Sequence, residues 1–130
     1  MTDELRRLLS KVATRDPAVP AALDALVAES GVSPPEDYLA FMASSDGGEG
    51  DVGETWIELW PIARIRGTLA SEPRYEGVVL FAGNGANTVY GFDRFRDNEI
   101  VEGDWIGLNR DELIPHGSTF ADFLRSLASA

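Results

Sequence analysis

Residues 78–93 have the sequence VVLFAGNGANTVYGFD, in which five small or polar residues separate two apolar runs. β-Branched and aromatic side chains dominate both runs, as they do in β-strands. Between them, Asn84-Gly85 supplies the positive φ angles that a hairpin turn requires. The stretch therefore predicts a buried antiparallel hairpin at the centre of a sheet.

Further strands are expected on both sides of this hairpin. Residues 55–60 alternate between two faces, as a half-exposed strand does, and residues 99–106 predict another short antiparallel strand. One face of the first strand carries Trp56, Glu58 and Trp60. Because Trp commonly packs in protein cores, we expect this face to be covered.

Helical patterns flank the expected sheet. Ser33 and Glu36 have the spacing of a capping box, as do Thr119 and Asp122, and Gly31 stands where a left-handed helix end is expected. Apolar spacing predicts helices over residues 3–13, 20–30, 34–44 and 120–127, with a short helical turn or an irregular connection over residues 62–69. We expect one α+β domain over residues 1–130, with a central, mainly antiparallel sheet flanked by N-terminal helices and a C-terminal helix.

The charge of the chain excludes several classes of partner. Its 130 residues include 22 acidic and 11 basic side chains, a formal net charge of -11, so its field repels nucleic acids and anionic membrane surfaces. The hydrophobic fraction of 44% is too high for a disordered acidic tail. The absence of Cys excludes disulfides, and no apolar run is long enough for a membrane span. We expect a soluble, cytoplasmic protein.

Much of the negative charge lies in one interval without a basic residue, between Arg15 and Arg64. Its densest part, residues 46–58, is expected to begin as a loop, because tandem glycines at 47 and 48 make helix continuation costly. Two interpretations remain open for this segment. It is either a solvated acidic loop that maintains solubility or a docking face for a basic partner.

Residues suited to catalysis or metal binding are few. The single His, His116, is expected in a turn beside Ser118, and adjacent turn residues rarely face each other as nucleophile and base. The glycines around Asn84 are followed by a strand pattern rather than the helix of a phosphate-binding loop. We therefore expect no catalytic residue, no metal site and no cofactor, although paired carboxylates of a hydrolase remain an open alternative.

Four segments in order resemble one family. They are PPEDYLAFM at residues 34–42 with SDGG at 45–48, IELWPI at 57–62, VLFAGNG at 79–85 with YGFD at 90–93, and TFADFL at 119–124. This set is similar to the SUKH superfamily, in particular its branch of Smi/Knr-like cell-wall-assembly regulators. The resemblance covers about residues 20–127.

The resemblance implies an α+β fold and a protein-binding role without catalysis. Bacterial members of the family are mostly immunity proteins that bind and neutralise a cognate toxin, often a nuclease, whereas fungal members resemble signalling scaffolds. The resemblance also implies structural roles, at turns and strand ends, for Gly47, Gly48, Gly83, Asn84, Gly85 and Asp93.

We therefore expect an immunity protein that binds a basic cognate toxin through an acidic face. Nuclease toxins are basic because their substrate is polyanionic, and an acidic inhibitor is steered towards them. The candidate partner-binding residues are Asp46, Glu49, Asp51, Glu54, Trp56, Glu58 and Trp60.

Two other functions remain as alternatives. One is a regulatory or scaffold adaptor for a housekeeping protein. The other is a small-molecule-binding or hydrolytic domain with a pocket near His116 or near the two tryptophans. The sequence leaves the toxin's identity and the oligomeric state open.

Overall fold

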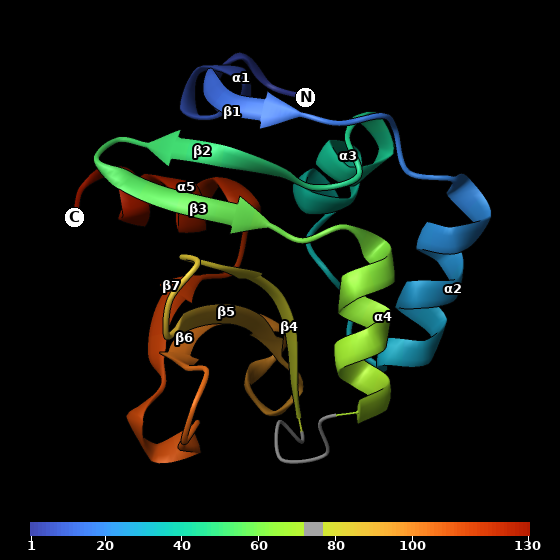
Figure 1. The fold of residues 1–130 in the computed structure, drawn as a ribbon, viewed down its shortest axis with the longest axis vertical. Helices are drawn as coiled ribbons and strands as arrows, with labels where there is room; N and C mark the ends of the chain where they lie inside the picture. The colour runs from blue at the N-terminus through green and yellow to red at the C-terminus, as the bar shows by residue number, and fades with distance from the viewer. Residues whose placement is uncertain (72–76) are drawn as a thin grey trace.

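A computed structural model describes residues 1–71 and 77–130 of the chain, and its centre is an antiparallel sheet (Figure 1). The strands lie side by side in chain order, and every neighbouring pair is antiparallel. They are β1 (Lys11–Thr14), β2 (Gly48–Val52), β3 (Thr55–Leu59), β4 (Val78–Gly83), β5 (Thr88–Asp93), β6 (Glu99–Asp104) and β7 (Ile114–Gly117). The predicted fold class, α+β with a mainly antiparallel sheet, is confirmed.

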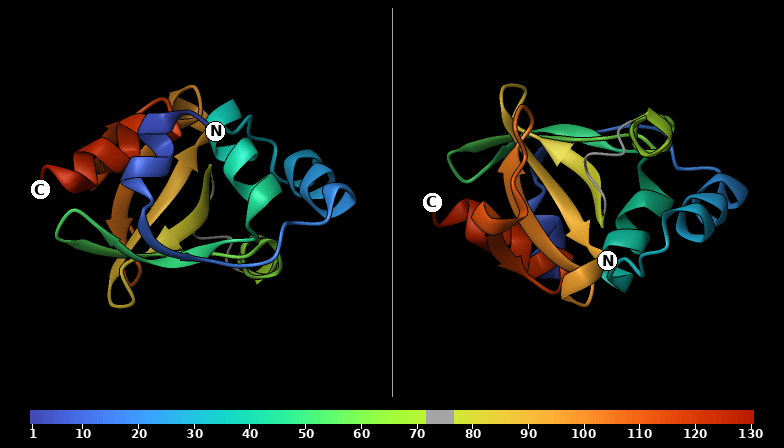
Figure 2. Two further views of the ribbon diagram at one scale, coloured as in Figure 1. Left: turned by 90° about the horizontal axis from the view of Figure 1, so that it is seen from above. Right: turned by 90° about the horizontal axis from the view of Figure 1, so that it is seen from below.

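Helices cover this sheet on more than one side. The α-helices are α1 (Asp3–Leu8), α2 (Pro20–Ser30), α3 (Glu36–Ser44), α4 (Ile62–Ser71) and α5 (Phe120–Ala128), and two short 3-10 helices are η2 (Arg94–Arg96) and η3 (Arg110–Glu112). Figure 1 shows α2 and α4 side by side at one end of the molecule, while α5 lies behind β2 and β3. Because β3 and β4 pair at only two positions, the sheet changes direction sharply between them (Figure 2).

The hairpin expected over residues 78–93 is confirmed as β4 and β5. Every residue of β4 is buried, as are the last five residues of β5. The rings of Phe81 and Phe92 stack with their centroids 4.3 Å apart, and Tyr38 of α3 meets both edge-on. Phe120 and Phe123 of α5 complete this aromatic core. The hairpin thus supplies two of the rings around which the core is packed.

The N-terminus of α5 is held by two side chains. Thr119 Oγ1 accepts a hydrogen bond from the backbone N of Asp122 at 3.0 Å, which confirms the predicted cap. Asp37 of α3 was not predicted to take part, yet its two carboxylate oxygens accept bonds from the backbone N of Phe120 and of Ala121, each at 2.9 Å. This carboxylate satisfies helix-end donors that would otherwise lack partners.

The predictions for the other helices are partly right. Helix α2 has the expected bounds, and Gly31 ends it with φ 69°. The capping box at Ser33 is wrong: the N-cap of α3 is Pro35, and no side chain caps that helix. Residues 62–69, expected as a short turn or irregular connection, belong to the ten-residue helix α4.

The expected helix over residues 3–13 is wrong in its second half. Helix α1 ends at Leu8, and β1 follows as an edge strand paired with β2. Leu5, Leu9 and Val12 are buried, so their spacing matches a helical stripe although Val12 belongs to a strand. Backbone pairing with β2, which is distant in sequence, decides the conformation here.

The strand expected over residues 55–60 is confirmed as β3, but the loop expected before it is wrong, because residues 48–52 form β2 and pair with β3 in a hairpin. Strand β2 reads GEGDV, a composition that is poor in strand-forming residues. A glycine is needed at position 50, since a Cβ added there would lie 2.2 Å from the backbone O of Lys11 in β1. The hairpin is also fixed to α5, because Thr55 Oγ1 donates a hydrogen bond of 3.0 Å to the Leu127 carbonyl.

Candidate protein-binding surface

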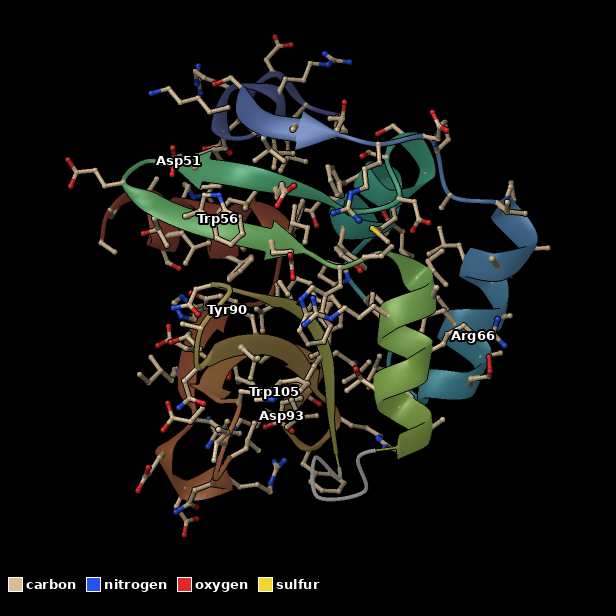
Figure 3. The ribbon with its side chains drawn as sticks, viewed as in Figure 1. Asp51, Trp56, Arg66, Tyr90, Asp93 and Trp105 are labelled. Carbon is tan, nitrogen blue, oxygen red and sulfur yellow. The ribbon has the colours of Figure 1, made fainter. Side chains whose placement is uncertain are left out.

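An acidic strip, defined here as Glu49, Asp51 and Glu54, lies on the exposed side of the β2–β3 hairpin. Glu49 and Asp51 are two residues apart on β2, so both side chains are on the same face. In the register, Glu49 lies opposite Glu58 and Asp51 opposite Trp56, both on β3. Figure 3 shows Asp51 and Trp56 on these neighbouring strands. Four of the predicted partner-binding residues therefore share one face of the hairpin.

The carboxylates of the strip have no ion pair in the described part of the chain, as is also true of exposed acidic residues elsewhere such as Asp24 and Glu112. Within residues 1–71 and 77–130, no salt bridge or side-chain hydrogen bond involves Glu49, Asp51 or Glu54. Like charges directly opposite on neighbouring strands, as in Glu49 and Glu58, destabilise a sheet. Glu58 is relieved by an ion pair with Arg64 of α4. A basic partner would relieve the rest.

Asp46 does not share this surface. Its Oδ1 accepts a hydrogen bond of 2.9 Å from the backbone N of Ile62, the first residue of α4. It therefore caps a helix, and its negative charge also adds to burial in raising the pKa of Tyr38. We assign Asp46 to the fold and remove it from the candidate partner-binding residues.

The two tryptophans expected on one covered face are separated by the structure. Trp60 is 1% exposed and follows the end of β3, whereas Trp56 is 39% exposed. The covering prediction is therefore right for Trp60 and wrong for Trp56. Trp56 lies against the β4–β5 turn, where a Cβ added to Gly85 would be 3.0 Å from its Cζ3 atom. The exposed indole extends the acidic strip with an aromatic surface.

A groove of about 330 Å³ lies beside the strip. We call it the tryptophan groove, and its lining residues are Glu58, Trp60, Arg64, Gly83, Gly85, Ala86, Thr88 and Trp105. The two indoles meet edge-on with centroids 5.8 Å apart, and the Arg64 guanidinium carbon is 4.0 Å from the centroid of the Trp60 ring. The indole N–H of Trp60 is buried and has no hydrogen-bond partner among the described residues.

The residues expected at turns and strand ends lie at such positions in the structure. Gly47 precedes β2 with φ 85°, and its added Cβ would be 2.5 Å from the Leu59 carbonyl oxygen. Asn84 Oδ1 accepts bonds from the backbone N of Ala86 and of Thr88, which closes the β4–β5 turn. Gly85 lies in that turn, Gly48 begins β2, and Gly83 and Asp93 end β4 and β5.

Asp93 also has an ionic role that the sequence did not reveal. Its carboxylate is fully buried, and Arg110 Nη2 donates to both oxygens at 2.9 Å. The Arg96 Nε atom is 3.6 Å from Oδ2, and the backbone N of Phe95 donates to Oδ1. These partners come from η2 and η3, so one buried carboxylate fixes both connections to the sheet.

His116 lies in β7, so the prediction that it sits in a turn is wrong. Its Nε2 is 2.8 Å from Glu102 Oε1, and its Nδ1 shares a hydrogen bond with the Ser126 hydroxyl rather than with Ser118. Ser126 also donates to the Phe123 carbonyl at 2.8 Å. The imidazole therefore connects β6, β7 and α5.

Tyr90 borders the same cluster, with its ring 5.7 Å from that of His116. Burial, together with the nearby Glu102 carboxylate, raises the pKa of Tyr90 to about 12.

In the described part of the chain, no group of three or more His, Asp or Glu side chains is placed to hold a metal ion. No helix there has the length and hydropathy to cross a bilayer.

A comparison with family models identifies the family of the chain. The model described as the SMI1 / KNR4 family (SUKH-1) matches residues 17–126. The chain belongs to this family. The resemblance over about residues 20–127 is therefore confirmed, and membership is consistent with a domain that binds other proteins. No curated protein matches the chain.

The sequence indicated one feature of the surface in part and missed another. A pocket near Trp56 and Trp60 was expected as one alternative, and Trp60 lines the tryptophan groove. The groove also joins α4, the β4–β5 turn and Trp105 after β6, which are far apart in the chain and could not be assigned to it from sequence. Sequence reasoning missed that Glu58 is paired whereas Glu49 is not, because that difference depends on where α4 places Arg64.

Proposed function

We propose that this SUKH-1 protein is a non-enzymatic immunity protein that binds and neutralises a basic cognate toxin. The observation that carries the proposal is the set of unpaired carboxylates of the acidic strip, presented beside the exposed Trp56 on a rigid hairpin. Aromatic side chains next to charged groups are frequent centres of binding energy in protein interfaces. Family membership supports a protein-binding role, and the toxin is the finer part of the proposal.

Electrostatic attraction also supports a basic partner. The net charge of -11 attracts a basic protein over several ångströms, and the strip gives that attraction a location. Carboxylates spaced along a strand also resemble a row of phosphates, which a nuclease binds in its substrate cleft. The inhibitor would thus occupy the cleft in place of nucleic acid.

A charge-reversal experiment tests the role of the strip. Replacing Glu49→Lys, Asp51→Lys and Glu54→Lys together should slow association with the toxin by about tenfold or more at low salt. The salt dependence of the association rate should flatten as well. The measurement is stopped-flow association with a purified toxin-like protein, sought among the products of neighbouring reading frames.

A matched control separates location from net charge. Asp24, Asp111 and Glu112 are exposed and lie outside the strip, so their replacement by Lys changes the net charge equally. This control should slow association much less, because screening weakens charges that are distant from the contact. Equal effects of the two triple variants would refute a located acidic interface.

Growth rescue distinguishes immunity from the adaptor alternative. Cells that produce the toxin should survive when the wild-type protein is co-expressed and should die with the strip variant. Survival that does not depend on the strip, or no rescue at all, would count against this proposal and favour an adaptor for a housekeeping protein.

A further inference from the structure

We infer that the tryptophan groove receives an arginine side chain of the basic partner, with its guanidinium bound by Glu58 and stacked against tryptophan. This inference rests on the proposed function, because it names the chemical group that the partner inserts. It differs from the acidic strip, which attracts the partner through charges that stay exposed.

The groove has the composition of a guanidinium site. Trp105 and Trp60, the latter beneath Arg64, line it with aromatic rings, Glu58 offers a carboxylate whose side chain is 26% exposed, and Thr88 adds a hydroxyl. Guanidinium groups stack on indole faces and form paired hydrogen bonds with carboxylates. A volume of about 330 Å³ is at the small end of ligand sites, which fits one long side chain.

The protein already places one guanidinium there. Arg64 lies 4.0 Å from the Trp60 ring centroid and pairs with Glu58, which is the arrangement we propose for the partner's arginine. Its side chain is 47% exposed and covers Trp60, so an entering guanidinium would have to replace Arg64 on that ring. Exposed ion pairs contribute little net free energy, so replacing Arg64 by the partner's arginine in the pair with Glu58 costs little free energy.

Two further observations favour a cation from outside. The groove borders the acidic strip, since Glu58 lies directly opposite Glu49, so the local field attracts positive charge. The indole N–H of Trp60 is buried and has no partner among residues 1–71 and 77–130, and an unsatisfied buried donor costs free energy. If Arg64 moves, a carbonyl oxygen of the entering segment could accept this bond.

A titration with small probes tests the groove without the toxin. N-acetyl-arginine amide is added to the ¹⁵N-labelled protein while the indole N–H signals of its three tryptophans are followed by NMR. We expect saturable shifts for Trp60 and Trp105, with a dissociation constant of about 10 mM, as suits one side chain. The uncharged citrulline analogue should bind at least about fivefold more weakly.

Three variants test how Glu58 and Arg64 affect arginine binding, with Arg66 as the control. Glu58→Gln keeps the shape of the side chain but should reduce arginine binding at least about fivefold, because the carboxylate is lost. Arg64→Ala should strengthen binding about threefold or more, because the internal competitor is removed. The matched control is Arg66→Ala on the same helix: Arg66 pairs with Glu29 on the α2 side, and its loss should change binding less than about twofold.

The outcomes separate this inference from the proposed function. Unchanged or weaker binding in Arg64→Ala, or equal binding of the citrulline analogue, would overturn the arginine site. If toxin association still depends on Glu49, Asp51 and Glu54, the proposed function stands without it. If the arginine probe binds as expected but strip reversal has no effect on the toxin, the groove is right and the acidic interface is wrong.

Discussion

The two hairpins of the sheet differ in what their side chains do. In β4–β5, nearly every residue is buried, and Phe81 and Phe92 stack within an aromatic core. In β2–β3, burial alternates along the strands, and the outward positions carry Glu49, Asp51 and Trp56. Both hairpins are antiparallel, although β4–β5 has a register shift between Leu80 and Ala82, so the direction of pairing alone does not assign their roles.

The two hairpins therefore differ in how they contribute to stability. The β4–β5 hairpin contributes apolar surface that folding removes from water, which is the main favourable free energy of a core. The β2–β3 hairpin carries Glu49 and Asp51, whose charges find no ionic partner within the described chain, and Glu49 lies opposite the like charge of Glu58. These charges add little to the stability of the fold, and under the proposed function a basic surface covers them.

The largest effect should come from truncating the buried hairpin. Phe92→Ala removes a ring that contacts Phe81 and Tyr38, and should lower the free energy of unfolding by about 3–5 kcal/mol. Trp56→Ala, a larger truncation on the exposed hairpin, should cost less than about 1.5 kcal/mol. Urea denaturation measures both. Similar losses would contradict the division between the hairpins.

A smaller effect is expected from glycine replacement in the exposed hairpin. Gly50→Ala would place a Cβ 2.2 Å from the Lys11 carbonyl oxygen, so it should cost about 2–3 kcal/mol and loosen β1. Gly67→Ala in α4 is the control, since no atom lies within 4 Å of the added Cβ. It should stabilise the protein by about 0.5–1 kcal/mol. Thermal unfolding and amide exchange of β1 measure the contrast.

Asp46 and Asp51, both within the acidic segment 46–58, should differ in their effect on stability. Asp46→Ala removes the cap of α4 and should cost about 1–2 kcal/mol. Asp51→Ala should stay within about 0.5 kcal/mol of wild type, because its carboxylate has no partner in the described chain. Equal costs would show that Asp51 has a role in folding after all.

The smallest effect concerns alkaline pH and Tyr90 in the buried hairpin. Folding raises the pKa of Tyr90 from 10.0 to about 12, so the folded state keeps a proton that the unfolded state loses. Stability should therefore be complete below pH 10 and fall as the pH rises towards 12, by less than about 1 kcal/mol at pH 10.5. Tyr90→Phe should show a shallower loss over this window in urea denaturation. An unchanged slope would contradict the raised pKa.

The fold could be predicted from sequence where local pattern and final burial agree. The β4–β5 hairpin has strand-forming residues on both sides of an Asn-Gly turn, and α5 has both its cap and its apolar stripe within a few residues. Prediction failed at β1, β2 and β7, which are short strands with few strand-forming residues. Their conformation is set by pairing with distant strands.

The candidate surface was predicted in outline only. Counting charges located the acidic segment, and alternation placed Trp56 and Glu58 on one side of a strand. The sequence could not show that Asp46 caps α4, that Arg64 pairs with Glu58 or that Trp60 is buried while Trp56 is not. Each of these depends on a contact between elements.

The sequence by itself determined the net charge, the central hairpin, the α+β class and the family resemblance, because these follow from composition and from short-range patterns. Only the tertiary structure decided which carboxylates are satisfied and which have no ionic partner in the described part of the chain. The physical reason is that a carboxylate's role depends on its nearest donor or cation, and for Asp37, Asp46 and Glu58 that group lies on another element of the fold.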